Sequence, residues 1–260
     1  MQSTLGNLID RRHLLRVLVA SNLKRQNKSS ALGYLWWLLD PMLMTAVYYL
    51  VVVVLFDRSG ANEPFILFLV CGLLPWKAFS QAVSQSITSL RGARGVVRAI
   101  SFPKAVLPLG LVVSNTVHFL FALVVVVVIA MAYGIWPTVH YLFLPLVIVF
   151  QMLFTAGLCL IMAVLGVFFL DTGNIMSHLL RMWYFLSPGL YSVEQVPESA
   201  RALFRLNPMC ELMTSYRDIL MWGKMPTAFD LGYALFAGVA CFLVGMIVFK
   251  SCEGRLVQKL

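Results

Sequence analysis

Four polar side chains recur along one side of an otherwise apolar stretch, at the i, i+4, i+7 and i+11 spacing of a single helical face: Lys77, Gln81, Ser84 and Thr88. They form hydrogen bonds and include no carboxylate or histidine. Because polar groups are costly in lipid, this face is expected to turn toward a bundle interior or a wet cavity. The pattern, with Gln85 beside it, indicates a hydrophilic path. The alternative is that these groups only link neighbouring helices by hydrogen bonds.

Aromatic side chains offer a second surface for a polar solute. Tyr34, Trp37 and Tyr48 fall on nearly one helical face, and such a face can stack against sugar rings. Trp183 and Tyr184 extend the candidate substrate path further along the chain. The competing interpretation is that the tryptophans only anchor helices at the membrane interface, where they are enriched.

The residue types that would carry catalysis or bind a metal are too dispersed to form a site. The sequence has no phosphate-binding G-x-x-x-x-G-K-[ST], no H-E-x-x-H and no G-x-S-x-G. Asp40, Asp171 and His118 lie far apart, and the cysteines include no C-x-x-C pair. The apolar stretches also lack the buried acids of a proton-driven carrier. We therefore expect no enzyme, no metal and no cofactor bound by this chain, and energy for transport must come from elsewhere.

Six apolar stretches must position these residues. They cover roughly 34–56, 64–90, 105–133, 141–170, 176–191 and 229–249. A helix needs about 20 mostly apolar residues to cross the hydrocarbon core of a membrane. Hydrophobic residues make up 60% of the chain and charged residues 12%, against about 25% charged in soluble domains. The chain is therefore expected to be an all-α, polytopic membrane protein with six transmembrane helices.

The net charge of +9 follows the expected topology. Lys and Arg gather before the first stretch, between the second and third stretches and after the sixth, while the connections after the first and third stretches are poor in them. Because positive loops stay on the cytoplasmic side, both termini are expected in the cytoplasm. Topology and attraction to anionic membrane lipids account for the charge, which argues against nucleic acid as a partner.

Three shorter segments are also expected to be helical. Residues 5–23 form either an interfacial helix or a solvated basic arm. The loop 91–104 contains a short basic helix over 92–100, which is either a topology signal or a docking surface for a cytoplasmic partner. The segment 192–228 contains helices over 197–206 and 209–222, which either form a lid or lie on the lipid headgroups.

Six short motifs occur in an order and spacing typical of one family: Leu32–Pro41, Gly72–Trp76, Ser101–Leu109, Leu186–Pro188, Leu206–Pro208 and Ser215–Leu220. On these motifs the chain resembles the ABC-2 type permeases that export bacterial cell-surface polysaccharides such as O-antigen, teichoic acid and capsule. The resemblance covers nearly the whole chain and is greatest to the O-antigen exporter permeases. It implies a single transmembrane domain over 1–260, located in the bacterial inner membrane.

The resemblance implies partners as well as a fold. The permease would be a homodimer, and two copies of a separate cytoplasmic ATPase, which uses ATP and Mg, would dock on it. The substrate would be a glycan on an undecaprenyl-pyrophosphate lipid. Segment 1–33 would carry the interfacial helix beside the lipid entrance, 34–190 the first five spans, 192–228 the periplasmic gate helices, 229–249 the sixth span and 250–260 a cytoplasmic tail.

The same resemblance assigns roles to individual residues. The 91–104 loop would be the coupling helix received by the ATPase, with contacts from Arg91, Arg94, Arg98, Ile100 and Phe102. The two outer helices would close the exit, with gate candidates Leu203, Phe204, Leu212, Tyr216 and Arg217. Basic residues near the inner interface would hold the pyrophosphate, with candidates Arg12, Arg16 and Arg181.

Three other functions are consistent with parts of the pattern. An ABC-2 exporter of a lipid or small drug would share the fold, but the polar face argues mildly against it. A membrane-embedded glycosyl- or acyltransferase acting on a polyprenyl lipid would need clustered acids or a histidine at an interface. A non-transporting scaffold would have no use for the polar face.

Overall fold

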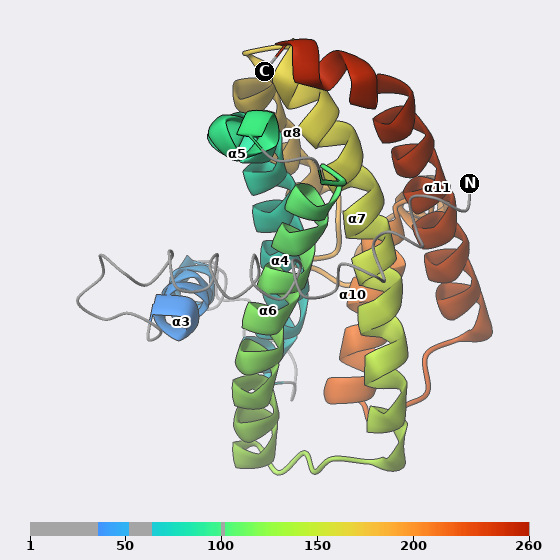
Figure 1. Ribbon diagram of the computed structural model, residues 1–260. Helices are drawn as coiled ribbons and strands as arrows, with labels where there is room; N and C mark the ends of the chain where they lie inside the picture. The colour runs from blue at the N-terminus through green and yellow to red at the C-terminus, as the bar shows by residue number, and fades with distance from the viewer. Residues whose placement is uncertain (1–35, 52–63, 100–101, 260) are drawn as a thin grey trace.

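The chain folds into an all-α bundle, which the computed structural model describes over residues 36–51, 64–99 and 102–259 (Figure 1). No β-strand occurs within these ranges. The helices, in chain order, are α3 (Trp36–Tyr49), α4 (Phe65–Gly92), α5 (Arg94–Ala99), α6 (Val106–Ala132), η3 (Val139–Phe143), α7 (Leu144–Phe168), α8 (Thr172–Phe185), η4 (Val193–Gln195), α9 (Glu198–Arg205), α10 (Pro208–Leu220) and α11 (Ala228–Lys259).

Several predictions fall outside the described part of the chain. The interfacial helix over 5–23 lies there, together with Arg12, Arg16, Tyr34 and Ile100. Three further candidates lie in described helices, but their side chains are not described: Trp37, Tyr48 and Arg98. The roles given to these residues above remain predictions.

Four segments of the described chain are long and apolar enough to cross a membrane: α4, α6, η3 with α7, and α11 up to Leu256. They correspond to the second, third, fourth and sixth predicted stretches. The first stretch is described over residues 36–51, mostly as α3, and its residues 34–35 and 52–56 lie outside the described ranges. The fifth forms α8, whose 14 residues reach about 21 Å and so fall short of the roughly 30 Å hydrocarbon core.

The last helix is longer than its sequence predicted. Residues 229–249 were expected to span and 250–260 to form a tail, yet α11 continues as one helix to Lys259. Phe249 and Leu256 explain the extension, because both are buried in an apolar cluster with Val97 and Phe102. This cluster ties α5 to the end of α11, and the two lie together at one end of the bundle, at the top of Figure 1.

Helix α4 occupies the middle of the bundle. It packs against α6 and α7, against α10 and α8, and against α3. Its apolar side chains form the centre of the main core, and Leu67, Phe79 and Val83 have no exposed surface. Because so many elements pack against α4, a polar group on it that remains exposed needs an explanation.

Helices α7 and α11 approach each other closely enough for their backbones to touch. A Cβ atom on Gly157 would lie 2.3 Å from the carbonyl group of Cys241, and one on Gly245 would lie 2.4 Å from the carbonyl oxygen of Gly157. Small residues allow such close packing of helices in membranes, where van der Waals contact rather than water exclusion drives association. Glycine is therefore required at both crossing positions.

Candidate functional site

The polar face of α4 lies on the outside of the bundle formed by this chain. Gln81, Ser84 and Thr88 are exposed and Lys77 is half-buried, whereas Phe79 on the opposite side is fully buried. The sequence predicted a face turned toward a bundle interior or a wet cavity. Among the residues that the structure describes in one chain, Gln81, Ser84 and Thr88 are open rather than packed inside the bundle.

Hydrogen bonds between helices account for only part of the polar set. Gln85 does link two helices, because its Oε1 accepts a hydrogen bond from Nδ2 of Asn115 on α6 at 3.0 Å. The hydroxyl of Thr88 instead donates to the carbonyl oxygen of Gln85 within its own helix, at 3.4 Å. The interpretation as interhelical links therefore fits Gln85 and leaves the exposed stripe of Gln81, Ser84 and Thr88 to be explained.

The same side of α4 is covered at its other half. Val70 and Leu74 line a small apolar cavity with Met42 of α3 and with Ala122 and Val126 of α6. Val70, Leu74, Lys77 and Gln81 continue one helical ridge. The ridge is thus apolar and covered at Val70 and Leu74, half-buried at Lys77, and polar and exposed at Gln81.

The aromatic candidates at the end of α8 do not join this stripe. Trp183 packs edge-on against Trp76, Phe79 and Phe154, with ring centroids 5.3–6.2 Å apart, and its Nε1 donates to Oδ1 of Asn207 at 2.9 Å. Tyr184 is buried, with its ring 5.5 Å from that of Trp76. Both residues therefore pack on the side of α4 that faces the core.

The predicted outer helices differ sharply from one another. Helix α9 has no buried residue; Leu203 is exposed, and the half-buried Phe204 has its ring 6.1 Å from that of Tyr191. Helix α10 is buried on nearly every side, including Leu212 and Tyr216 among its gate candidates. Since α10 packs against α4, α7 and α11, it does not lie on the lipid headgroups.

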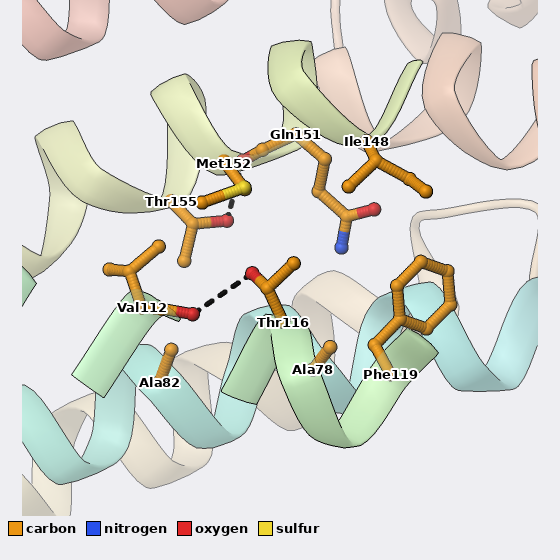
Figure 2. Close-up of a pocket in the computed structure, with 9 residues that line it drawn as sticks. All are labelled: Ala78, Ala82, Val112, Thr116, Phe119, Ile148, Gln151, Met152 and Thr155. Carbon is orange, nitrogen blue, oxygen red and sulfur yellow. Dashed lines mark hydrogen bonds between the residues drawn. The ribbon is translucent and has the colours of Figure 1, made fainter. Parts of the chain in front are cut away.

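Tyr216 belongs to a hydrogen-bond chain that joins three helices. Its hydroxyl donates to Oε1 of Gln151 on α7 at 2.8 Å, and Nε2 of Gln151 donates to the carbonyl oxygen of Pro75 on α4 at 2.8 Å. Figure 2 shows the side chain of Gln151 reaching toward a small cavity between α4, α6 and α7, opposite Thr116 and beside Phe119. The cavity measures about 10 Å³, about enough for one water molecule and too small for a sugar.

Arg217, the last gate candidate, is a buried cation held by backbone oxygens. Its Nε donates to the carbonyl oxygen of Phe68 at 3.3 Å and its Nη2 to that of Gly189 at 2.9 Å. The guanidinium carbon lies 3.6 Å from the centre of the Phe68 ring, a cation–π arrangement. A Cβ on Gly72 would meet Nη2 at 2.7 Å, so that glycine makes room for the arginine.

The predicted coupling segment is anchored at the α5 end of the bundle. Arg91 donates from Nη2 to the carbonyl oxygen of Val167 at 3.1 Å, Arg94 is exposed, and Phe102 is buried. Nζ of Lys104 lies 3.7 Å from Oε1 of Glu253 on α11. The short helix predicted over 92–100 is present as Arg94–Ala99. Arg181, proposed from the sequence for pyrophosphate, is exposed on α8.

Sequence reasoning missed two buried acids. Glu211 in α10 is 3% exposed and Asp230 in the first turn of α11 is 5% exposed. Burial, and then hydrogen bonding with and repulsion by Asp230, raise the pKa of Glu211 to about 8. Helical periodicity alone gave no signal for them, because their burial depends on the packing of α11 against α10. The expectation that buried acids are lacking is therefore wrong for this end of the bundle.

Comparison with known proteins decides the family. The model of the family described as ABC-2 type transporter matches residues 13–221, most of the chain. The chain belongs to the ABC-2 type transporter family. This membership confirms the prediction of a multi-pass membrane protein that serves as a transport subunit. It also agrees with the four long apolar helices, and with a sequence that contains none of the catalytic motifs considered above.

Individual relatives of this ABC-2 type transporter cover nearly all of it. It is 38% identical over 251 residues to the O-antigen export system permease protein RfbA of Myxococcus xanthus, covering 96% of each chain. It is 30% identical to the protein of the same name from Klebsiella pneumoniae, covering 99% of this chain and 98% of the other. With the polysialic acid transport protein KpsM of Escherichia coli, identity is 23% over 87% of this chain and 88% of the other.

Proposed function

We propose that this chain is the permease subunit of an ATP-driven exporter that moves a lipid-linked polysaccharide, of the O-antigen class, across the bacterial inner membrane. Family membership and the similarity to O-antigen export permeases over nearly the whole chain support the proposal. The alternative, an ABC-2 exporter of a lipid or small drug, would not need an extended polar face on a membrane-crossing helix.

The observation that carries the proposal is the outward-facing polar stripe of α4. Gln81, Ser84 and Thr88 are exposed on a helix that is long and apolar enough to span. Lipid is a poor environment for such a face, and ionisable or amide groups at membrane depth usually line a wet cavity. A second copy of the chain related by twofold symmetry would place two stripes opposite each other and enclose a hydrated path between them. Homodimerisation is thus part of the proposal.

The charges at the α5 end support a topology with that end in the cytoplasm. Arg94, Lys250 and Arg255 are exposed there, and positive residues collect on the cytoplasmic side of membrane proteins. In this arrangement α3 and α8 belong to the first and fifth of six spans, and both termini are cytoplasmic. Helices α9 and α10 then lie toward the periplasm, where they would act as the gate helices that close the exit.

The source of energy would be two copies of a separate ABC ATPase that hydrolyses ATP with Mg. Helix α5 is the proposed coupling helix, because it presents Arg94 outward and is fastened to α11 through Val97 and Phe102. Movement of the docked ATPase would then reach both α4 and α11. Arg181, with Arg12 and Arg16, remains the proposed contact for the pyrophosphate of an undecaprenyl-linked glycan.

Thiol cross-linking tests the enclosed path. In a chain without its native cysteines, Ser84→Cys is expected to yield a covalent dimer in native membranes when a thiol-specific cross-linker long enough to span the path is added, because the twofold axis places the two stripes across that path. Val244→Cys, also exposed but on the apolar side of α11, is the matched control and is expected to stay monomeric. A dimer through residue 244, with none through residue 84, would contradict the proposed arrangement.

Co-purification tests the ATPase partner. The double substitution Arg94→Glu and Arg98→Glu is expected to lower the amount of co-purified ATPase at least about ten-fold, since complementary charges favour association at exposed sites. The amount of folded permease should not change, because Arg94 is exposed. Full retention of the ATPase by the double variant would count against docking on α5.

A further inference from the structure

Two carboxyl groups from different helices share a buried site next to α9. Glu211 lies in the first turn of α10 and Asp230 in the first turn of α11, and both side chains are at least nine-tenths buried. Helices α10 and α11 pack directly against each other. Oε1 of Glu211 is buried and accepts no hydrogen bond from any residue in the described ranges. A buried carboxylate oxygen without a donor is costly, so this oxygen points to a missing proton.

The surrounding charges do not neutralise the pair. On α9 the exposed Arg205 attracts Glu211, and on α11 the hydroxyl of Tyr233 is near Glu211 but donates to the carbonyl oxygen of Leu206. On α10, Cys210 adjoins Glu211. No salt bridge to Glu211 or Asp230 forms among the residues that the structure describes.

The environment of Asp230 adds more negative charge. Asp218 on α10 feels the charge of Asp230, and is itself near Lys224 and Glu194. Burial and repulsion by Asp230 raise the pKa of Asp218 to about 6. Cys210 has Arg205 and Arg217 as its cationic neighbours. The site therefore gathers three carboxyl groups, those of Glu211, Asp218 and Asp230, and Lys224 and Arg205 offset their charge only in part.

Burial and the charge of Asp230 keep a proton on Glu211, because a low dielectric and a nearby like charge both disfavour the ionised form of a carboxyl group. The helix dipole at the start of α10 and the nearby Arg205 favour the ionised form of Glu211. Burial and Asp230 outweigh both, because the pKa of Glu211 is still raised to about 8. At neutral pH Glu211 thus holds a proton that an exposed acid would have lost.

We propose that Glu211 and Asp230 form a proton-binding site that fastens α10 to α11. With the proton bound, the carboxyl O–H of Glu211 donates to a carboxylate oxygen of Asp230, and α10 remains packed. When the proton leaves to water, two like charges face each other and α10 is pushed away from α11. If α10 is the outer gate, which rests on the proposed function, acid in the periplasm closes the exit and alkali releases it.

The direction in which pH changes the packing of α10 follows from the linkage between proton binding and stability. The pKa of Glu211 is higher in the packed state than the ordinary value of 4.5, so the packed state binds the proton more tightly. Packing of α10 is therefore most stable below pH 4.5, weakens as the pH rises, and has lost this contribution above about pH 8. Each pH unit within that window changes the balance about ten-fold.

The test uses the purified full-length chain in lipid nanodiscs and measures two quantities that do not depend on export. Infrared spectroscopy at about pH 7 detects the carbonyl band of a protonated carboxylic acid, which should disappear in Glu211→Gln. Hydrogen–deuterium exchange of 208–220 at about pH 9 should be at least about ten-fold faster in the natural protein than in Glu211→Gln, which mimics the bound proton. Comparison at the same pH cancels the intrinsic pH dependence of exchange.

Two further variants keep the result interpretable. Glu198→Gln removes an exposed carboxylate from α9 and should reproduce the natural protein in both measurements. Asp230→Asn removes the repelling neighbour and should move the midpoint of α10 release to a different pH without abolishing folding. An infrared band unaffected by Glu211→Gln, or equal exchange of 208–220 in both proteins at every pH, would overturn the proton site. A loss of export alone would leave it intact and would concern the gate.

Discussion

The outward faces of α4 and α11 show how differently two membrane-crossing helices of one bundle can be covered. Helix α11 exposes large apolar side chains, and Phe236, Val244 and Ile247 are 51–69% exposed. Helix α4 is largely buried, and much of what it exposes beyond its midpoint is polar, including Gln81 and Ser84. The first face matches lipid and the second does not. An exposed side chain in a single chain therefore has to be interpreted by its polarity, because apolar groups suit lipid and polar groups require water or another subunit.

The inward faces differ less. Helix α11 meets α7 through Gly245 and Gly157, with almost no side chain between the backbones. Helix α4 also meets α7 at a glycine, because a Cβ atom on Gly166 would collide with the carbonyl oxygen of Ile87. What α4 adds is a layer of large groups such as Trp76 and Phe79, whose rings contact Trp183.

The largest effect is expected from a charge placed on each outward face. Val244→Lys should disfavour membrane insertion of α11 by about 3 kcal/mol, because a lysine near the middle of a lipid-facing helix is costly. Gln81→Lys, near the middle of α4, should change insertion by less than about 1 kcal/mol if water covers that face. Glycosylation mapping of the last helix and quantification of membrane-inserted protein provide the measurement. Equal losses at both positions would remove the distinction between the two faces.

The next effect concerns the backbone contact beneath the apolar face. Gly245→Ala should reduce the stability of the chain by about 1–3 kcal/mol, because the added methyl group meets the carbonyl oxygen of Gly157 at 2.4 Å. Gly232→Ala on the same helix is the matched control, since nothing lies within 4 Å of its added methyl group. It should be neutral or slightly stabilising, as alanine is the better helix former. Thermal unfolding in detergent distinguishes the two variants.

Water access gives a smaller and direct comparison of the faces. In a cysteine-free chain, Thr88→Cys should react at least about ten-fold faster with a charged maleimide than Ile247→Cys, because the thiolate that reacts forms in water. Both natural side chains are exposed, so accessibility alone predicts similar rates. Similar rates in native membranes would mean that α4 has no hydrated face.

The smallest effect is expected at the ion pair that joins the coupling segment to α11. Glu253→Gln should lower stability by no more than about 1 kcal/mol, because the pair of Lys104 and Glu253 is partly exposed and spans 3.7 Å. Leu256→Ala, which opens a cavity in the buried cluster below that pair, should cost about 2–5 kcal/mol. If the ion pair contributed more than Leu256, the attachment of α11 would be electrostatic rather than apolar.

The spacing of residues was enough to predict the elements and the faces that a single helix determines. The polar face of α4 and the packed face of α10 both followed from helical periodicity, and Leu212 and Tyr216 on the latter have no exposed surface. The end of α10 was also predicted, since Gly223 has a φ of +58° and stops the continuation. Local rules hold here because each face is set by residues within one helix.

What the sequence did not reveal depends on neighbours distant along the chain. The aromatic ring of Trp183 suggested a side chain that binds sugar. In the structure it packs against Trp76, Phe79 and Phe154, which belong to two other helices. Nothing in the sequence indicated the burial of Glu211, because it depends on the packing of α11 against α10. Hydropathy assigned a fifth span to residues 176–191, but the turn at Leu186–Gly189 ends α8 before it is long enough to cross.

The contact of Gly157 with Gly245 determines which parts of the protein are able to move. Two helices whose main chains touch cannot slide or rotate past one another without collision, because no flexible side chain lies between them to give way. The α7–α11 pair therefore behaves as a rigid frame, fixed throughout any working cycle. The same argument holds where α7 meets α4, because a Cβ atom on Gly166 of α7 would collide with the carbonyl oxygen of Ile87. The polar stripe of α4 therefore belongs to the same rigid frame, and rearrangement is left to the side-chain contacts of α8 and α10.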